Sequence, residues 1–307
     1  MTTFLSVVIT TYNRAGYLQK VLYSLKDQTL PQEKYEVIVI DNASTDQTKE
    51  ITNQYQNQIT NLLYVYEGVP SLTKARNTGW QKARGNYIFY IDDDAIAHAD
   101  WLASIYTACI DQSKDILGGK VIPIWESPRP SWLHDKLLGA LSIVDYSSTP
   151  QFLTKKYPFG VNMGFRKELL ERTGGFNSKL GRKGTKLLSG EETALIKQLQ
   201  KKGCTVYYDP AICVYHHIQE VRLHQSWFTQ RYYWGGYSDA LMWRILEKPT
   251  PFRWVKQLCT SIYSFLRNPS HIFYIRKETN NPEVFWFKCI VYARIGYIRG
   301  LFDFSKN

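Results

Sequence analysis

The residues with the clearest chemical potential are three consecutive carboxylates, Asp92, Asp93 and Asp94, in the segment YIFYIDDDAI. An apolar run typical of a buried strand precedes them, and adjacent carboxylates repel one another unless water or a bound cation neutralises them. Acidic residues after a strand also form solvated turns or cap the next helix. The triplet therefore predicts either a cation site or a polar turn, and the surrounding elements must decide.

The first hundred residues contain the elements that position this triplet. Short apolar segments alternate with helix-like ones, which predicts an α/β fold with repeated βαβ units and a mostly parallel sheet. The expected strands are FLSVVITT, YEVIVIDN, NLLYVYEG and NYIFYIDDD, at residues 4–11, 35–42, 61–68 and 86–94. Ligands bind such sheets at the carboxyl ends of the strands.

Polar side chains end three of these strands. The first ends in Thr10 to Asn13, the second in Asp41 and Asn42, and the fourth in the Asp triplet. We expect them to meet at one edge of the sheet. No G-x-G-x-x-G follows the first strand and no G-x-x-x-x-G-K-[ST] occurs, which disfavours dinucleotide and P-loop phosphate sites.

The composition indicates a folded globular protein. Of 307 residues 44% are hydrophobic, and five scattered cysteines lack any zinc-site spacing. The apolar N-terminal run predicts a strand rather than a signal peptide, and charges interrupt every stretch long enough to span a bilayer. We therefore expect a cytoplasmic protein that is neither secreted nor inserted in a membrane.

Five segments in order resemble the inverting family 2 glycosyltransferases, which have the GT-A fold. They are VVITTYNR, VIVIDNASTDQT, ARNTGWQKARGNYIFYIDDDA, GVNMGFRKELLERTGGF and GEETALIKQLQKKG, within residues 6–217. The resemblance implies a Rossmann-like, mostly parallel central sheet flanked by helices. It places a catalytic domain at residues 1–225, with a donor half at about 1–100 and an acceptor half at about 101–225. Residues 226–307 would form a helical, basic and aromatic C-terminal extension.

The resemblance gives the Asp triplet a role in holding Mn or Mg on the diphosphate of a nucleotide-sugar donor. Hard cations take oxygen ligands, and alternation along a strand would place Asp92 and Asp94 on one side and Asp93 on the other. By similarity to the D-x-D pattern, Asp94 contacts the metal, Asp92 binds the ribose or a metal-bound water, and Asp93 contributes to either. His216 corresponds to a histidine that completes this site in part of the family, and His217 is the alternative.

The resemblance also assigns the residues that recognise the nucleotide base. Asp41 would accept a hydrogen bond from a uracil imide N–H, and Thr10 and Tyr12 would frame the ring. Arg76 would reach the uracil or the diphosphate. The alternatives are that Asp41 only caps the helix after it and that Arg76 is a solvated helix residue.

The general base is expected at the start of a helix after Gly190. Inversion is a single displacement, which needs one carboxylate near the acceptor hydroxyl. The family typically has Glu-Asp here, and this chain has Glu191 and Glu192, so the second side chain is one methylene longer. We assign Glu192 as the base and Glu191 to acceptor binding. The alternative is that both only complement the helix dipole.

The resulting functional prediction is metal-assisted, inverting sugar transfer in polysaccharide biosynthesis. The donor is a UDP-sugar, and the acceptor is a hydroxyl of a glycan or lipid-linked substrate. An inactive glycosyltransferase-like scaffold is an alternative. A sugar-nucleotide pyrophosphorylase is weaker, because it needs a Gly-rich basic loop after the first strand. We expect no nucleic-acid partner, because converging carboxylates repel a polyanion.

The net charge of +11 lies mainly in the C-terminal region. Residues from Leu241 to Asn307 include eleven Lys and Arg against four Asp and Glu. Aromatic and basic residues alternate in FRWVKQLCTSIYSFLR and FWFKCIVYARIGYIRGLFD, which favours a peripheral position on an anionic membrane at its cytoplasmic face. Packing on the catalytic domain and a homodimer interface are the alternatives.

Overall fold

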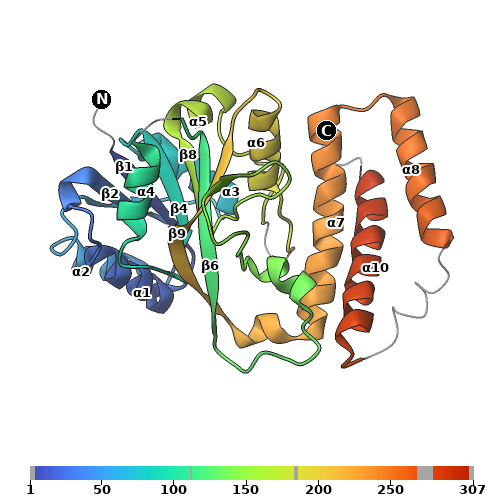
Figure 1. Cartoon of the computed structure of the whole chain (residues 1–307), viewed down its shortest axis with the longest axis horizontal. Coiled ribbons are helices and arrows are strands. Elements are labelled where there is room, and N and C mark those ends of the chain that lie inside the picture. Colours follow the sequence, from blue (N-terminus) through green and yellow to red (C-terminus); the bar gives the residue numbers. More distant parts are fainter. Residues whose placement is uncertain (1–3, 111–112, 183–185, 268–278, 304–307) are drawn as a thin grey trace. The chain divides into compact units, whose positions relative to one another are not determined.

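A computed structural model describes residues 4–110, 113–182, 186–267 and 279–303 (Figure 1). The chain forms two compact units. The first comprises Met1–Ile124, Ser142–Ser178 and Leu195–His217, and the second comprises Trp125–Leu141, Lys179–Ala194 and Ile218–Asn307. The second unit thus draws on three parts of the chain, and the predicted domain boundary at residue 225 stays a prediction.

A nine-stranded mixed sheet forms the framework of the first unit. Its strands are β1 (Leu5–Thr11), β2 (Tyr35–Asp41), β3 (Leu62–Tyr66), β4 (Tyr87–Asp92), β5 (Ala95–Ala97), β6 (Ile116–Trp125), β7 (Gln151–Phe152), β8 (Asn162–Arg166) and β9 (Val206–Ile218). Their order is β3-β2-β1-β4-β8-β6-β9-β5, with β7 on β9. The first four are parallel, and β8 joins β4 antiparallel. The predicted α/β class is confirmed, with antiparallel strands in the second half of the sheet.

Helices cover this sheet and explain its continuous apolar strands. They are α1 (Ala15–Lys26), α2 (Thr48–Tyr55), α3 (Leu72–Lys82), α4 (Trp101–Cys109) and α5 (Lys167–Thr173), with the short η1 (Gln32–Lys34) before β2. Val7, Val8 and Ile9 are consecutive in β1 and fully buried. A strand covered on both faces has no solvent side and so needs no polar alternation.

The register of the parallel strands brings their polar ends together, as the sequence predicts. Thr10 of β1 lies opposite Asp92 of β4, and Thr11 lies opposite Asp41 of β2. The loops after β1, β2 and β4 therefore leave the sheet at one edge. This edge carries the candidate site.

The second unit is mainly helical, which confirms the predicted helical C-terminal region. Its elements are η2 (Asp135–Leu141), η3 (Glu220–Leu223), α7 (Gln225–Glu247), α8 (Pro251–Leu266) and α10 (Pro282–Leu301), together with the first turn of α6 (Glu191–Gln200). Among the described residues, no helix combines the length and hydropathy needed to cross a bilayer.

Part of the segment 285–303, which was expected to face lipid, lies in the core of this unit. Phe285, Lys288 and Cys289 of α10 are buried, and the ring of Phe285 meets those of Trp132 and Phe228. The ring of Phe285 therefore stabilises the fold, because its neighbours in this unit cover it. The membrane prediction for this segment stays a prediction.

Close contact between α7 and α10 depends on glycine. A Cβ added at Gly236 of α7 would meet the carbonyl oxygen of Ala293, and one at Gly296 of α10 would meet that of Tyr233. Figure 1 shows the two helices running side by side. Backbones this close leave no room for a methyl group.

This packing predicts opposite effects for two adjacent glycines. Gly236→Ala should destabilise the protein by about 1–3 kcal/mol, because the added methyl forces the helices apart. A Cβ added at Gly235 would meet no atom within 4 Å, so Gly235→Ala should stabilise by up to about 1 kcal/mol through helix propensity. Urea denaturation of both variants measures the difference. Equal effects would show that the contact with α10 does not limit packing.

Candidate active site

The Asp triplet lies at the end of β4 and in the turn that follows. The strand ends at Asp92, and Asp93 and Asp94 form the turn before β5. Asp92 is 34% exposed at its side chain, whereas Asp93 and Asp94 are buried. Strand alternation does not continue past Asp92, so the expectation that Asp93 points away from Asp94 is wrong.

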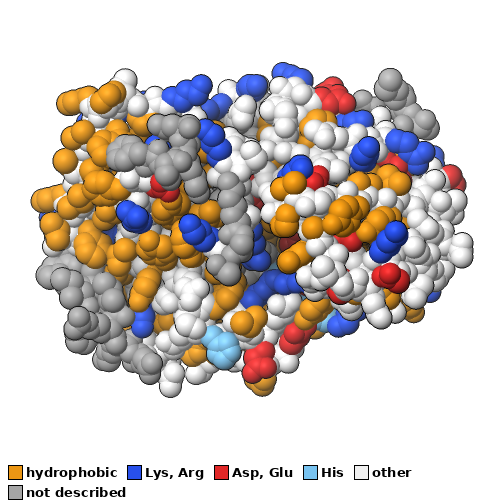
Figure 2. All heavy atoms as spheres, turned by 180° about the vertical axis from the view of Figure 1, so that it is seen from behind, with side chains coloured by type: hydrophobic (Ala, Val, Ile, Leu, Met, Phe, Trp, Pro, Cys, Tyr) orange, Lys and Arg blue, Asp and Glu red, His pale blue; other side chains and the backbone are white. Residues whose placement is uncertain are grey.

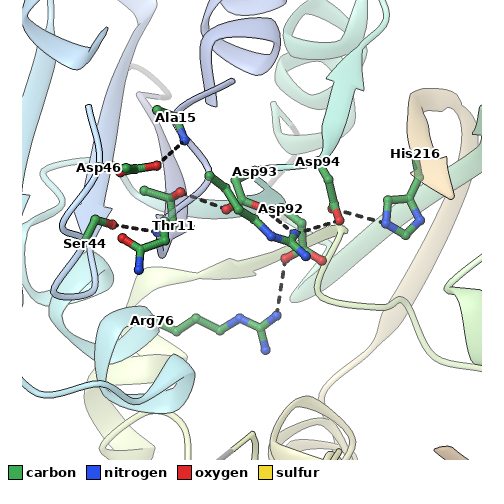
Figure 3. Close-up of polar contacts among 11 residues, drawn as sticks. Thr11, Ala15, Ser44, Asp46, Arg76, Asp92, Asp93, Asp94 and His216 are labelled. Atoms are coloured by element: carbon green, nitrogen blue, oxygen red, sulfur yellow. Dashed lines mark hydrogen bonds and ion pairs between the residues drawn. The ribbon is translucent and has the colours of Figure 1, made fainter. Parts of the chain in front are cut away.

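Asp93 and Asp94 share a cationic partner, Arg14, from the loop after β1. Its Nη1 lies 3.0 Å from Asp93 Oδ1 and 2.9 Å from Asp94 Oδ2. Thr11 Oγ1 also donates to Asp93 Oδ2 at 2.8 Å (Figure 3). Burial and the neighbouring Asp94 raise the pKa of Asp93 to about 6, against the opposing effect of Arg14. The guanidinium of Arg14 therefore offsets the repulsion between the two carboxylates at this turn.

His216 and His217 have different surroundings, which separates the two candidates. His216 is buried in β9 opposite Ala95, and its Nε2 lies 3.2 Å from Asp94 Oδ1. The ring of His217 instead lies edge-on to that of Tyr17, 5.5 Å away, and its backbone N–H donates to the Asp94 carbonyl. Of the two side chains, the one beside the carboxylate is His216.

Arg76 is buried beside the first carboxylate of the triplet. The residue is 3% exposed, and its Nη2 lies 3.6 Å from Asp92 Oδ1. A Cβ added at Gly160 would meet the same nitrogen, and the Phe176 ring centroid lies 5.9 Å from the guanidinium carbon. Arg76 is therefore not a solvated helix residue. It is a fixed positive charge at the edge of the sheet.

Asp41 is a buried acceptor with a fixed orientation. Its Oδ1 accepts from the Ser44 N–H at 2.8 Å and its Oδ2 from the Tyr64 hydroxyl at 2.7 Å. Asp46, rather than Asp41, accepts the N–H of Thr48 at the start of α2. The idea that Asp41 only caps this helix is therefore wrong. A carboxylate has about four acceptor positions, so a base imide N–H can be added to the two bonds present.

The two remaining residues predicted to contact the base lie at the end of β1. Thr10 is half-buried beside Asp92, and Tyr12 is 52% exposed. An exposed ring next to a polar edge is available for stacking on a base. The structure therefore brings Thr10, Tyr12, Asp41 and Arg76 to the strand ends that carry the carboxylates.

The charge and donor set of this edge fit a divalent cation shared with a diphosphate. Three carboxylates, at residues 92, 93 and 94, face two guanidinium groups, those of Arg14 and Arg76. Among the residues described, no three His, Cys, Asp or Glu side chains gather as a metal cage. Mg typically takes one or two carboxylates and completes its coordination with water and substrate phosphates, and Mn has similar ligand preferences. Asp94 matches the carboxylate of such a partial set, and His216 beside it would add a nitrogen ligand.

Glu191 and Glu192 begin α6 in the second unit. Gly190 has φ of 92°, a left-handed conformation that favours glycine, and the two acids occupy the first helical turn. Glu191 is buried and Glu192 half-buried. Arg231 of α7 lies near enough to interact electrostatically with both and also donates to the Leu187 carbonyl at 3.2 Å. A half-buried arginine near two glutamates offsets part of their negative charge.

Arg14 and Arg231 are the charged residues that the sequence alone did not single out. Arg14 ends the motif TTYNR, directly after a strand expected to reach the acidic edge. A basic residue at that position was therefore a usable signal. Arg231 gives no such signal, because it is one cation in a helical, basic segment and its neighbours are distant in sequence.

Comparisons with known proteins identify the family of the chain. The profile described as Glycosyl transferase family 2 matches residues 6–174. The glucosyl-dolichyl phosphate glucuronosyltransferase of Haloferax volcanii is 23% identical over 241 residues, which are 77% of this chain and 76% of that protein.

Two solved structures share the fold at 19% identity. The mannosyltransferase PcManGT from Pyrobaculum calidifontis, solved with GDP-Man and Mn²⁺, has a TM-score of 0.65 over 99% of this chain and 88% of its own. S. aureus TarS 1–349, solved with UDP-GlcNAc, has a TM-score of 0.58 over 97% of this chain and 89% of its own. With the family profile matching more than half of its residues, the chain belongs to glycosyl transferase family 2.

Proposed function

We propose that this protein transfers a sugar from a nucleotide-diphosphate donor to an acceptor hydroxyl with inversion. The observation that carries the proposal is the edge at the ends of β1, β2 and β4. There Asp94 lies beside His216 and Arg14, and Arg76 lies beside Asp92. A site with clustered carboxylates and fixed cations suits a diphosphate bound together with a metal ion.

The residues of this edge have separate proposed roles in donor binding. Asp41, Thr10 and Tyr12 bind the base, and Arg76 approaches the base or the diphosphate. Asp92 binds the ribose or a metal-bound water, and Asp93 contributes to either role. Asp94 and His216 would hold Mn or Mg, which when bound supplies positive charge to the diphosphate leaving group. We propose UDP as the nucleotide, since Asp41 can accept from the uracil imide N–H.

In the proposed reaction Glu192 acts as the general base. It takes the proton of the acceptor hydroxyl as that oxygen forms the new bond to the anomeric carbon, while the bond to the diphosphate breaks. A single displacement inverts an α-linked donor to a β-linked product. Glu191 helps to bind the acceptor, and Arg231 compensates the charge of the pair.

The acceptor is proposed to be lipid-linked or a growing glycan, as in polysaccharide biosynthesis at the cytoplasmic face of a membrane. Support comes from the Haloferax volcanii relative, whose name gives a dolichyl phosphate-linked acceptor. An inactive scaffold is a second candidate, although the carboxylates at residues 92, 94 and 192 are all present. A pyrophosphorylase has no additional support.

A nucleotide screen tests the proposed donor. Calorimetric titration with UDP, GDP and dTDP and their sugars, with and without Mn, should give the tightest binding for a UDP compound and at least a tenfold gain with metal. Release of UDP from the matching sugar in the presence of acceptor then measures transfer. Preference for GDP would overturn only the choice of nucleotide, whereas binding without any release would favour the inactive scaffold.

A further inference from the structure

Helix α8 carries an apolar stripe on its outer face. The members of this stripe are exposed and recur every three or four residues, as on one side of a helix. They are Phe252 (77% exposed), Val255 (49%), Cys259, Tyr263 (64%) and Leu266 (67%). They extend along about 21 Å of helix. In Figure 2 orange side chains gather on the side of the second unit that carries α8.

The opposite face of α8 packs on α10, which fixes the stripe outward. Trp254 Nε1 donates to the Leu301 carbonyl at 3.1 Å, and its ring meets that of Phe302 edge-on. Gln257 Nε2 donates to the Tyr297 hydroxyl at 3.1 Å. Thr250 caps the N-terminus of the helix, because its side chain accepts the Arg253 N–H. The stripe is therefore a surface of an ordered helix.

Basic residues line one border of the stripe. On a helical wheel Lys256, Arg267 and Arg253 follow one another along the edge next to Tyr263, and all three are exposed. Residues 248–267 contain four Lys and Arg and no Asp or Glu. Arg253 lies 3.7 Å from Glu247, and because both side chains reach solvent this ion pair contributes little energy.

We propose that α8 lies flat on an anionic membrane, with the apolar stripe in the headgroup boundary and the basic border on lipid phosphates. Aromatic rings favour this boundary, and basic side chains next to a buried apolar face are typical of interfacial helices. The proposal rests on the proposed function in one respect, namely that membrane binding would bring the enzyme to a lipid-linked acceptor.

A second copy of the chain fits this surface less well. A single stripe of five side chains buries a few hundred Å², well below the ~800 Å² per partner of a stable interface. The basic border would also meet a partner segment that has no acidic residues. An anionic bilayer has neither restriction, since lipids adapt to a narrow helix and supply the negative charge.

Vesicle flotation of the full chain, without donor, tests the proposal. The protein should float with phosphatidylglycerol-containing vesicles at low salt, less at high salt, and not with neutral vesicles. Tyr263→Ser should lower the partition coefficient at least tenfold, whereas Tyr23→Ser in α1, 58% exposed, should not. The double variant Lys256→Gln, Arg267→Gln should lower the partition coefficient about fivefold for each charge removed. The control double variant Lys49→Gln, Lys82→Gln should not.

A fluorophore on Cys259 reports the depth of the stripe directly. Cys259 is exposed, Cys204 is half-buried, and the other three cysteines are buried, so a Cys204→Ser background directs the label. An environment-sensitive dye should shift to the blue with anionic vesicles only. No flotation, equal losses in the matched variants, or a dimer by light scattering that Tyr263→Ser dissolves, would overturn the proposal. Failure of UDP release with normal flotation would instead contradict the proposed function.

Discussion

Asp94→Asn should remove the metal-dependent part of donor binding and lower turnover by about a hundredfold to a thousandfold. Asn keeps the shape of Asp but loses the charge, which a hard cation needs in its ligands. Binding titrations with and without EDTA measure the first effect, and UDP release measures the second. The wild type should lose affinity on chelation, and the variant should show no further loss.

The fold should survive this substitution. Arg14 is paired with both Asp93 and Asp94, so one carboxylate remains beside the guanidinium when the other becomes an amide. Removing a like charge from Asp93 also offsets part of the lost attraction. Thermal denaturation should therefore change by much less than turnover. Identical titration curves for variant and wild type in excess metal would contradict the role of Asp94.

The sequence did not show whether His216 or His217 belongs to the site. Neighbouring residues of a strand point to opposite faces of the sheet, but the sequence does not tell which of the two faces the carboxylates. That choice depends on how β9 pairs with β5, which sets Ala95 opposite His216. Antiparallel pairing between segments so distant in the chain follows from tertiary packing.

Other parts of the site were predictable from local pattern. Continuous apolar runs predicted buried strands. Polar residues after β1, β2 and β4 predicted a shared edge, because the carboxyl ends of parallel strands lie at the same edge of a sheet. The error in the triplet came from extending strand geometry by two residues. Strand ends are set by hydrogen-bond partners, and β1 pairs with β4 only as far as Asp92.

The C-terminal region shows the limit of composition. Segments 252–267 and 285–303 are both aromatic and basic, yet α10 buries several of its residues whereas α8 buries none and exposes its apolar stripe. Gly236 and Gly296 contribute to the difference, because they let α7 and α10 approach closely. The sequence alone does not distinguish a glycine that permits a close contact between helices from one that only lowers helix propensity.

Glu192→Gln should lower turnover by roughly a hundredfold or more while leaving donor affinity unchanged. The amide keeps the volume and much of the hydrogen bonding of the carboxylate but cannot accept the acceptor's proton at neutral pH. Glu192 is half-buried, and Glu191 beside it is buried, so the two positions differ in access to an acceptor. Steady-state UDP release and calorimetric donor titration give the two quantities separately.

Two further variants separate the base from its neighbour and from the effect of side-chain length. Glu192→Asp shortens the side chain to the length usual at this position in the family, so it should retain far more turnover than Glu192→Gln, because a carboxylate is still present. Glu191→Gln should mainly raise the acceptor KM, because its proposed role is binding. A larger loss of turnover in Glu191→Gln than in Glu192→Gln would transfer the base to Glu191. Similar, small losses of turnover in both variants would indicate that the two glutamates only complement the helix dipole and that another group takes the acceptor's proton.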